Sequence, residues 1–304
     1  MDAGTAALQH ATAISNEWRS HAFRELREFE VPTGAILSAG DLVGAVRLVE
    51  VSPASEYSIW GPRHLSLLAL RGADASGEDP DSPNLADLEA LLDNWLERVG
   101  PEAVPSVELP VAIRGAARVF ALRGFQPVSA LAVRKIQATD AAAAGRHGVK
   151  LRRPEPGDRD ALLDLLRELH RADWEAGSAA DHEELDEHLL VYVDRILADP
   201  SQVWVAHYFG MLTGFASFAV DTARQYSGYA SERYLQFASV TRRMRGGGIG
   251  HALVDALHRD AAAAGVDAIT VNFAVMNAES APFWHRRGYR PLTTIWRRLG
   301  GQRG

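Results

Sequence analysis

Glycines crowd the stretch Arg245 to Gly250, which reads Arg-Gly-Gly-Gly-Ile-Gly and stands between an expected strand and an expected helix. Glycine permits positive φ angles and lets a ligand approach the backbone without obstruction from a Cβ atom. Free N–H groups and the positive dipole end of the helix would face that ligand. Arg243 and Arg245 add positive charge. We interpret the stretch as a cradle for a pyrophosphate-like anion; the alternative is a tight turn that is merely rich in glycine.

Two common phosphate-binding motifs do not fit this spacing. A dinucleotide fingerprint needs a third glycine three residues after a G-x-G pair, and the relevant positions hold His251 and Leu253. A P-loop needs Gly-Lys-Ser/Thr, and no lysine stands near the glycines. The pattern therefore favours a different strand-loop-helix cradle.

The same stretch resembles the acyl-CoA-binding signature of the GNAT superfamily of N-acyltransferases, Arg/Gln-x-x-Gly-x-Gly/Ala. Arg245, Gly248 and Gly250 fill that signature. A second GNAT signature, with an asparagine, an aromatic pair and a Gly-aromatic pair, resembles the segment Asn277 to Tyr289. The resemblance covers residues 150–299 well and residues 1–137 in outline.

The resemblance implies acetyl-CoA as cosubstrate and no metal. In the family, backbone amides of the cradle hold the pyrophosphate, the preceding strand pairs with the pantetheine arm, and the acyl group lies where two strands diverge, near donors for an oxyanion. By similarity, the residues that contact acetyl-CoA are Ser239, Val240, Arg245, Gly246, Gly247, Gly248, Ile249, Gly250, Asn277 and Phe283.

The chain contains no cysteine, which excludes a cysteine acyl-enzyme and favours direct attack of an amine on the thioester. The resemblance implies a glutamate base on the strand before the cradle, but Gln236 occupies that position. An amide is no base, so we expect Gln236 to orient a water that relays the proton to Glu232, Asp221 or His207.

The family's general acid is a tyrosine, and the matching position here is Trp284, which cannot transfer a proton at useful pH. Tyr226, Tyr229 and Tyr234 are the substitutes, each with packing as its alternative role. The segment 173–175 is expected in the connection between two helices, where by similarity it shapes the acceptor pocket.

Other catalytic motifs are missing. His182 with His188, and His251 with His258, lack a zinc-ligand spacing such as H-E-x-x-H, so we interpret these histidines as solvated. No G-x-S-x-G element supports a serine hydrolase.

Composition narrows the class of protein further. The 304 residues are 47% hydrophobic and 23% charged, as in a folded globular protein, and lack an apolar run long enough to span a membrane. The formal net charge of −7 makes nucleic acid an improbable partner. We expect a cytoplasmic protein that binds neither nucleic acid nor membrane; assembly into a homodimer is left open.

Elements of the second half must position these residues. The expected order there is helices 158–171 and 182–198, strands 202–208, 214–220 and 234–240, helix 251–264, strand 269–275, helix 280–287 and strand 290–298. The first half repeats that order loosely, with helical residues 5–28, strands 34–38, 42–51 and 64–70, helix 84–99, strand 106–113, helix 115–123 and strand 127–135.

Both halves end alike, in a helix, a glycine, an aromatic residue and a strand: Phe120 to Pro127 matches Phe283 to Pro291. The acidic stretch 72–83 replaces the cradle in the first half. We therefore expect an α/β fold of two tandem GNAT-like domains, each a mixed, mainly antiparallel sheet flanked by helices. The expected boundaries are a degenerate domain at 1–137, a linker at 138–149 and a GNAT N-acetyltransferase domain at 150–304.

The sequence thus predicts an acetyl-CoA-dependent N-acetyltransferase that acts on a primary amine of a small molecule. A non-catalytic CoA-binding sensor or scaffold, and an acetyltransferase for protein or peptide amines, remain open alternatives. Transfer to a sugar-linked cysteine amine, as in tandem-domain mycothiol synthases, fits the length but has no support from individual residues.

Overall fold

We analysed a computed structural model that describes residues 34–40, 42–71, 85–111, 115–142, 148–219, 227 and 229–298. The expected helix at 5–28 and the acidic stretch 72–83 lie outside these residues. The described chain forms two compact units that are each assembled from separate stretches of sequence. Of the described residues, the first unit contains those of 34–52, 62–131 and 291–298, and the second contains those of 53–61 and 132–290.

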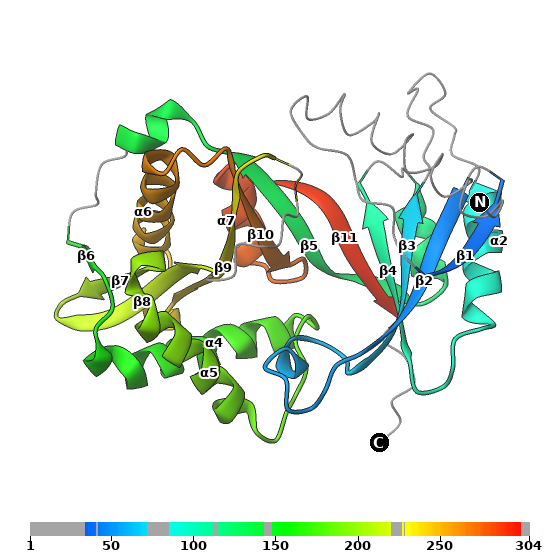
Figure 1. Ribbon diagram of the computed structural model, residues 1–304, viewed down its shortest axis with the longest axis horizontal. Coiled ribbons are helices and arrows are strands. Elements are labelled where there is room, and N and C mark those ends of the chain that lie inside the picture. Colours follow the sequence, from blue (N-terminus) through cyan, green and yellow to red (C-terminus); the bar gives the residue numbers. More distant parts are fainter. Residues whose placement is uncertain are drawn as a thin grey trace. The chain divides into compact units, whose positions relative to one another are not determined.

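The first unit is a mixed sheet with strand order β1-β2-β3-β4-β11 (Figure 1). Pairing is antiparallel except between β3 and β4, which are parallel. Its elements are β1 Ala35–Ala39, β2 Leu42–Glu50, β3 His64–Arg71, α2 Leu85–Leu96, β4 Val104–Pro110, α3 Ala116–Leu122, the first part of β5 Phe125–Lys135, and β11 Arg290–Arg298.

Helix α2 buries an apolar face in the core of the first unit. Leu88, Leu91, Leu92 and Trp95 recur at helical spacing and are all buried in one core with residues of α3 and the sheet. Such a stripe commits one face of the helix to the sheet. The Trp95 indole N–H also donates to the Ser66 hydroxyl at 3.0 Å, so the buried nitrogen keeps a partner.

The second unit has strand order β10-β9-β8-β7-β6. Pairing is antiparallel except between β9 and β10, which are parallel. Its elements are η1 Ser58–Trp60, η2 Ala138–Ala142, β6 Lys150–Arg152, η3 Pro156–Asp158, α4 Arg159–Glu175, α5 Leu185–Ala198, η4 Pro200–Gln202, β7 Val203–Tyr208, β8 Met211–Phe218, β9 Glu232–Val240, η5 Arg242–Met244, α6 Ile249–Ala263, β10 Ala268–Ala274 and α7 Ser280–Arg286.

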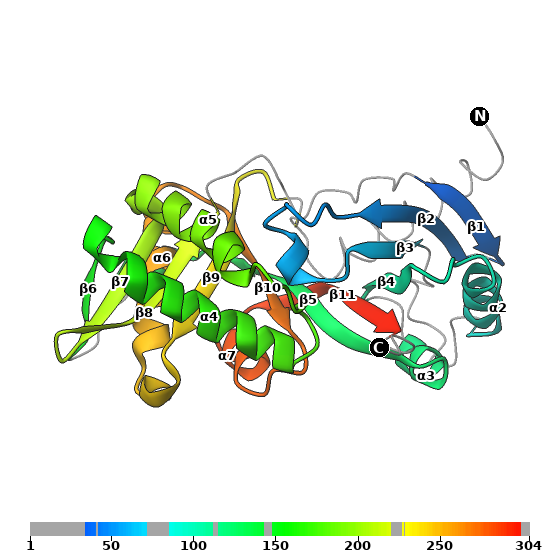
Figure 2. The ribbon, with the colours of Figure 1, turned by 90° about the horizontal axis from the view of Figure 1, so that it is seen from below.

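Helices α4 and α5 cover one face of the second sheet, and α6 lies on the other, as Figure 2 shows. Leucines of α4 pack against Phe215 of β8 and Phe237 of β9 in a single core. The side chains of a strand alternate between faces, which allows β8 and β9 to hold helices on both sides.

A short segment from the first half of the sequence, residues 53–61, belongs to the second unit. Ile59 is fully buried in the core of α4 and α5. Its carbonyl accepts hydrogen bonds from the Ala180 amide at 2.9 Å and lies 3.0 Å from His170 Nε2. The Trp60 indole donates to the Tyr192 hydroxyl at 3.0 Å. The segment therefore acts as a brace for the end of α4. Its sequence did not predict this position.

The element orders of the two units match, since β1-β2-β3-α2-β4-α3-β5 repeats β7-β8-β9-α6-β10-α7-β11. This agrees with the expected α/β class and tandem arrangement. Most expected boundaries hold within a few residues. The exception with consequences is α4, which continues to Glu175, so Asp173 to Glu175 form its last turn and not a connection.

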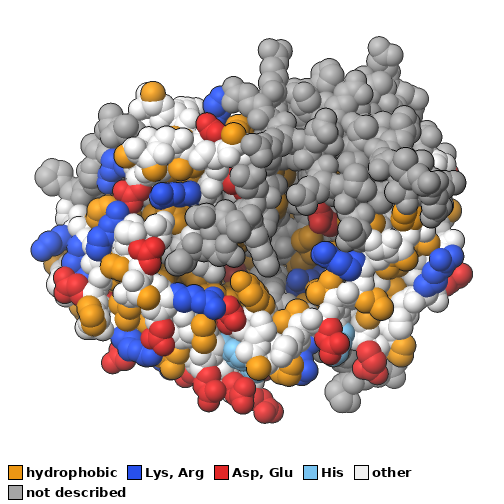
Figure 3. All heavy atoms as spheres, viewed as in Figure 1, with side chains coloured by type: hydrophobic (Ala, Val, Ile, Leu, Met, Phe, Trp, Pro, Cys, Tyr) orange, Lys and Arg blue, Asp and Glu red, His pale blue; other side chains and the backbone are white. Residues whose placement is uncertain are grey.

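Basic and acidic side chains are interspersed over the described part of the face drawn in Figure 3. That pattern accords with 32 basic and 39 acidic residues in the chain. Among the described residues, no helix is both long and apolar enough to cross a membrane.

Candidate active site

A cavity of about 550 Å³ opens in the second unit between the last turn of α4, the end of β9, the start of α6 and the start of α7. This is within the usual size of a small-molecule site, roughly 300–1,000 Å³. Its lining includes Leu169, Ala172, Asp173, Ala238, Ser239, Val240, Met244, Arg245, Gly246, Gly248, Ile249, Gly250, His251, Asn277, Glu279, Phe283, Trp284 and Arg286.

The cavity lies along the last residues of β9, Ala238 to Val240, beyond the end of the ladder between β9 and β10. Their parallel ladder joins Ala268 to Glu232 and ends at Val271 opposite Leu235. Strand β9 continues to Val240 and β10 continues to Ala274. Beyond the ladder, backbone groups on this side of β9 are available to a ligand. The expected divergence of two strands at the site is therefore present.

The glycine stretch forms the start of α6. Gly248 is the N-cap residue and has φ 86°, and Gly246 has φ 79°. Both angles lie in the region that side chains with a Cβ rarely adopt. The first-turn N–H groups of a helix have no partner within it. The expected anion cradle is thus a left-handed turn followed by free amides and a positive helix end.

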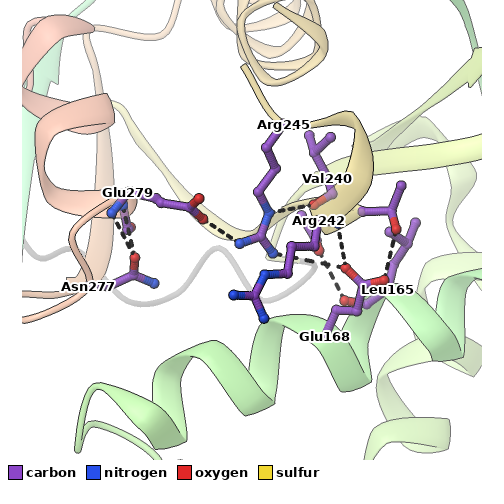
Figure 4. A network of polar contacts seen from close by, with 10 residues as sticks. Leu165, Glu168, Val240, Arg242, Arg245, Asn277 and Glu279 are labelled. Atoms are coloured by element: carbon purple, nitrogen blue, oxygen red, sulfur yellow. Dashed lines mark hydrogen bonds and ion pairs between the residues drawn. The ribbon is translucent and has the colours of Figure 1, made fainter. Parts of the chain in front are cut away.

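Arg245 is held by groups from three elements (Figure 4). Its Nε donates to the Val240 carbonyl at 2.9 Å, and its terminal nitrogens pair with Glu279 and reach Glu168 at 4.0 Å. Glu168 of α4 also accepts from the Thr241 hydroxyl at 2.8 Å. The positive charge of Arg245 is therefore compensated by carboxylates that an anionic ligand would have to displace or share.

Asn277 orders the turn before α7. Its Oδ1 accepts the backbone N–H groups of Glu279 and Ser280, each at 3.1 Å. The side-chain oxygen is therefore used within the turn, which leaves the amide NH2 group as the part of Asn277 that can donate to a ligand in the cavity.

The structure brings together all the residues that the resemblance assigned to acetyl-CoA except Gly247, which does not line the cavity. Ser239 has its hydroxyl bound to the Leu165 carbonyl at 3.0 Å, so only its main chain is available to a ligand.

The residues proposed for proton transfer lie elsewhere. Glu232 is at the opposite end of β9 from the cradle, about 26 Å from Val240 at the usual rise per strand residue. Its carboxylate accepts from the amide and hydroxyl of Ser227. Gln236 and Tyr229 do not line the cavity, and Tyr229 is buried. Tyr226 and Asp221 lie outside the described residues.

Asp173 lines the cavity from the last turn of α4. Burial raises the pKa of this carboxyl to about 7. Its backbone carbonyl accepts from the amides of Ser178 and Ala179, which fixes the end of the helix. The sequence placed Asp173 in a connection that shapes the acceptor pocket by similarity; the structure places it in the last turn of α4, in the lining of the cavity.

Trp284 occupies the cavity wall and is nearly buried, with its indole N–H bound to the Ser280 hydroxyl at 3.2 Å. Tyr289 packs behind it with a ring-centroid distance of 5.1 Å. The position that would hold a tyrosine acid in the family is therefore part of the wall here.

Two of the four histidines interpreted as solvated are buried, so that interpretation is wrong for His188 and His258. His258 lies 3.0 Å from the Tyr289 hydroxyl, and burial lowers its pKa to about 3. Ring nitrogens of His182 and His188 and a carboxylate oxygen of Glu184 lie within 4.8 Å of one another. A turn brings His182 back to α5, which a search for H-E-x-x-H does not detect.

Comparison with known proteins defines the class. Residues 160–289 match the model of the acetyltransferase (GNAT) family. A GCN5-related N-acetyltransferase from Sphaerobacter thermophilus is 16% identical with a TM-score of 0.54, over 96% of this chain and 91% of that one. Because that likeness spans both units, it shows the fold of each.

Two further solved structures are similar over most of their lengths. A GCN5-related N-acetyltransferase from Kribbella flavida is 16% identical over 96% of each chain, with a TM-score of 0.45. A tandem GNAT protein from the clavulanic acid biosynthesis pathway is 12% identical over 95% of this chain and 94% of that one, with a TM-score of 0.43. Among curated protein sequences, none matches this chain.

The expected resemblance is confirmed: residues 160–289 match the acetyltransferase (GNAT) family, and the chain shares the α/β fold of the Sphaerobacter thermophilus protein. The family supports acyl transfer as the general activity.

Proposed function

We propose that this protein transfers an acetyl group from acetyl-CoA to a primary amine of a small molecule by direct attack. The observation that carries the proposal is that one cavity joins the glycine cradle at the start of α6 to the last residues of β9, which lie beyond the end of the β9–β10 ladder. A ligand with a pyrophosphate at one end and a reactive acyl group at the other spans such a site.

The residues present fit acetyl-CoA. A Cβ added at Gly246 would meet nothing within 4 Å, so open space lies above that part of the cradle. The amides at the start of α6 would bind the pyrophosphate. The edge of β9 at Ser239 and Val240 would pair with the pantetheine arm. Phe283, whose ring is 5.2 Å from that of His251, provides an apolar wall.

The chain's own part in the reaction is to orient two substrates and stabilise charge. Backbone N–H groups of β9 beyond Leu235 can donate to the oxygen of the thioester as it gains negative charge. The apolar surfaces of Leu169, Phe283 and Trp284 restrict water around the reacting carbonyl. No residue needs to form a covalent intermediate.

Gly248→Glu tests the cofactor assignment. A side chain at φ 86° is strained, and a carboxylate there repels a pyrophosphate, so we expect acetyl-CoA binding to fall at least 100-fold by calorimetry. Gly265→Glu is the matched control, since Gly265 has φ 68° in open space after the other end of α6. Equal affinity of the two variants for acetyl-CoA would contradict the assignment of the glycine cradle as the binding site.

A CoA-binding sensor without turnover is the second candidate, favoured by Gln236 and Trp284 at positions where the family carries its base and acid. Release of free thiol from acetyl-CoA, followed across small amines and a peptide with a free amino terminus, separates the candidates. Acetylation of any amine rejects the sensor. A preference for the peptide over every small amine would replace the small-molecule acceptor.

A further inference from the structure

Asp173 is the acidic side chain that α4 contributes to the lining of the cavity. It is only partly exposed, and no hydrogen bond or ion pair of its carboxyl group is found in the described part of the chain. The other charged or titratable groups of the lining are Arg245, His251, Glu279 and Arg286. Arg245 forms ion pairs with Glu279 and Glu168, and its salt bridges do not include Asp173.

The location of Asp173 opposes the usual electrostatics of a helix. The carboxyl end of a helix carries partial negative charge, which destabilises an acidic side chain in the last turn. Its neighbours in the lining, Leu169, Ala172 and Ala238, are apolar and disfavour the ionised form. Burial is the sole resolved cause of its raised pKa. A cationic group brought into the cavity would stabilise the ionised form of this carboxyl group.

The backbone that carries this carboxyl group is held in place. The end of α4 is fixed by Ser178, whose amide and hydroxyl both bind the Asp173 carbonyl, at 2.9 and 3.0 Å. One turn earlier, His170 is fixed by the carbonyl of Ile59. The titratable groups near this turn, on α4 and on the segment after it, are His170, Arg171, Glu175, Asp181 and His182, and none of them is among the causes of the raised pKa of Asp173.

We infer that Asp173 binds the protonated amino group of the acceptor and removes its proton. This inference rests on the proposed function and deepens it: the acceptor belongs to the class of amines that are cationic at neutral pH. It also gives the proton a destination within the cavity, which Gln236 and Glu232 do not provide.

The transfer balances as follows. The Asp173 carboxylate accepts one proton from the ammonium group, and the nitrogen lone pair then forms a C–N bond with the thioester carbonyl carbon. The C–S bond breaks, and the thiolate sulfur takes the second proton that the nitrogen loses. The proton on Asp173 leaves to solvent, so one amide, one thiol and one proton are produced for each thioester consumed.

The test compares Asp173→Asn with the wild type, using Glu175→Gln as matched control. Glu175 is exposed in the same helical turn and does not line the cavity. Acetyl-CoA binding is measured by calorimetry, and thiol release is measured from pH 5.5 to 9 with butylamine, a diamine, an aminosugar and an amino acid. A neutral acceptor of similar shape, butanol, serves as a negative control.

We expect all three proteins to bind acetyl-CoA within twofold of one another. The wild type and Glu175→Gln should show kcat/KM rising through a limb near pH 7, where Asp173 loses its proton. Asp173→Asn should lose that limb and at least 100-fold in kcat/KM at pH 7.5. If Asp173→Asn keeps both the wild-type kcat/KM and its rise near pH 7, the role of Asp173 is overturned and the proposed function is not. Absence of thiol release from the wild type with every amine overturns the proposed function and this inference together.

Discussion

At the scale of single residues, Glu279 competes with the ligand for the cation of the cradle. It forms an ion pair with Arg245, which also binds the Val240 carbonyl. Both side chains are partly exposed, so the pair contributes about 1 kcal/mol or less. That energy would oppose the proposed binding of a pyrophosphate to the same guanidinium.

Replacing Glu279 by Gln should therefore tighten acetyl-CoA binding about two- to fivefold, because the pair no longer opposes the anion and one repulsive charge is removed. The gain should shrink as salt is raised, since exposed charges are screened. Calorimetry at low and high ionic strength measures both effects. Glu187→Gln changes the net charge equally at an exposed site outside the cavity and should have no effect. Weaker binding of Glu279→Gln would instead assign Glu279 to positioning Arg245.

Asp173 also predicts how stability depends on pH. Its pKa of about 7 in the folded protein exceeds the value near 3.8 of a free carboxyl, so the folded state retains the proton longer. The folded state is therefore destabilised as pH rises through the window from about 4 to 7. Asp173→Asn removes this titration. Relative to the wild type, the variant should gain up to about 2–3 kcal/mol between pH 5 and pH 8.

Urea unfolding at the two pH values measures that gain. Glu175→Gln serves again as control and should leave the pH dependence of the wild type unchanged. A constant difference between Asp173→Asn and the wild type across this range would mean that the carboxyl group titrates normally in the folded protein.

At the scale of elements, residues 53–61 act as a brace for α4 and α5. Ile59→Ala removes a fully buried side chain from their core and should destabilise the second unit by about 2–5 kcal/mol. Leu48→Ala removes a side chain that is 77% exposed and should change stability by less than about 0.5 kcal/mol. Unfolding followed by tryptophan fluorescence compares the two. Equal stability of the variants would mean that the brace contributes nothing.

The sequence predicted most elements because hydrophobic spacing and glycine positions are local signals. The glycine stretch at 246–250 predicted the start of α6, and β11 was predicted with its observed bounds. The part of the cavity lining at Arg245 to Gly250, Asn277 and Phe283 followed from two family signatures, whereas the part from α4 did not. The end of α4 was misplaced because Asp173 and Trp174 interrupt the apolar spacing, although the turn remains helical.

The features that the sequence did not predict depend on tertiary contacts. Burial of His188 and His258 depends on neighbours far apart in the sequence, such as Tyr289 at 3.0 Å from His258. The roles of Glu168 and Glu279 around Arg245 arise only when α4 and α7 meet the cradle. The brace at 53–61 packs against residues more than a hundred positions away, and no periodicity encodes such a contact.

At the scale of the whole molecule, the two compact units do not divide at one point of the chain. Strand β11 belongs to the first unit, where residues 106–110 of β4 pair with residues 293–297. A fragment of residues 1–137 would therefore lack a strand and leave β4 as an unpaired edge, which favours aggregation.

We expect fragment 1–137 to be aggregated or unfolded in size-exclusion chromatography and circular dichroism. A fragment that carries residues 290–298 joined to its end through a flexible linker should be more compact and show a cooperative thermal transition. A monomeric, cooperatively folded 1–137 fragment would show that β11 is dispensable for the first unit.

The return of β11 also sets an order of events during synthesis. About 160 residues separate the end of the first unit's earlier part, at position 131, from the start of its last part at 291. At about 5–20 residues per second, a ribosome needs about 8 to 30 s to make that stretch. The first half of the newborn chain must therefore wait for the last strand to emerge, and during that interval a chaperone that shields the edge of β4 would have its longest opportunity to act.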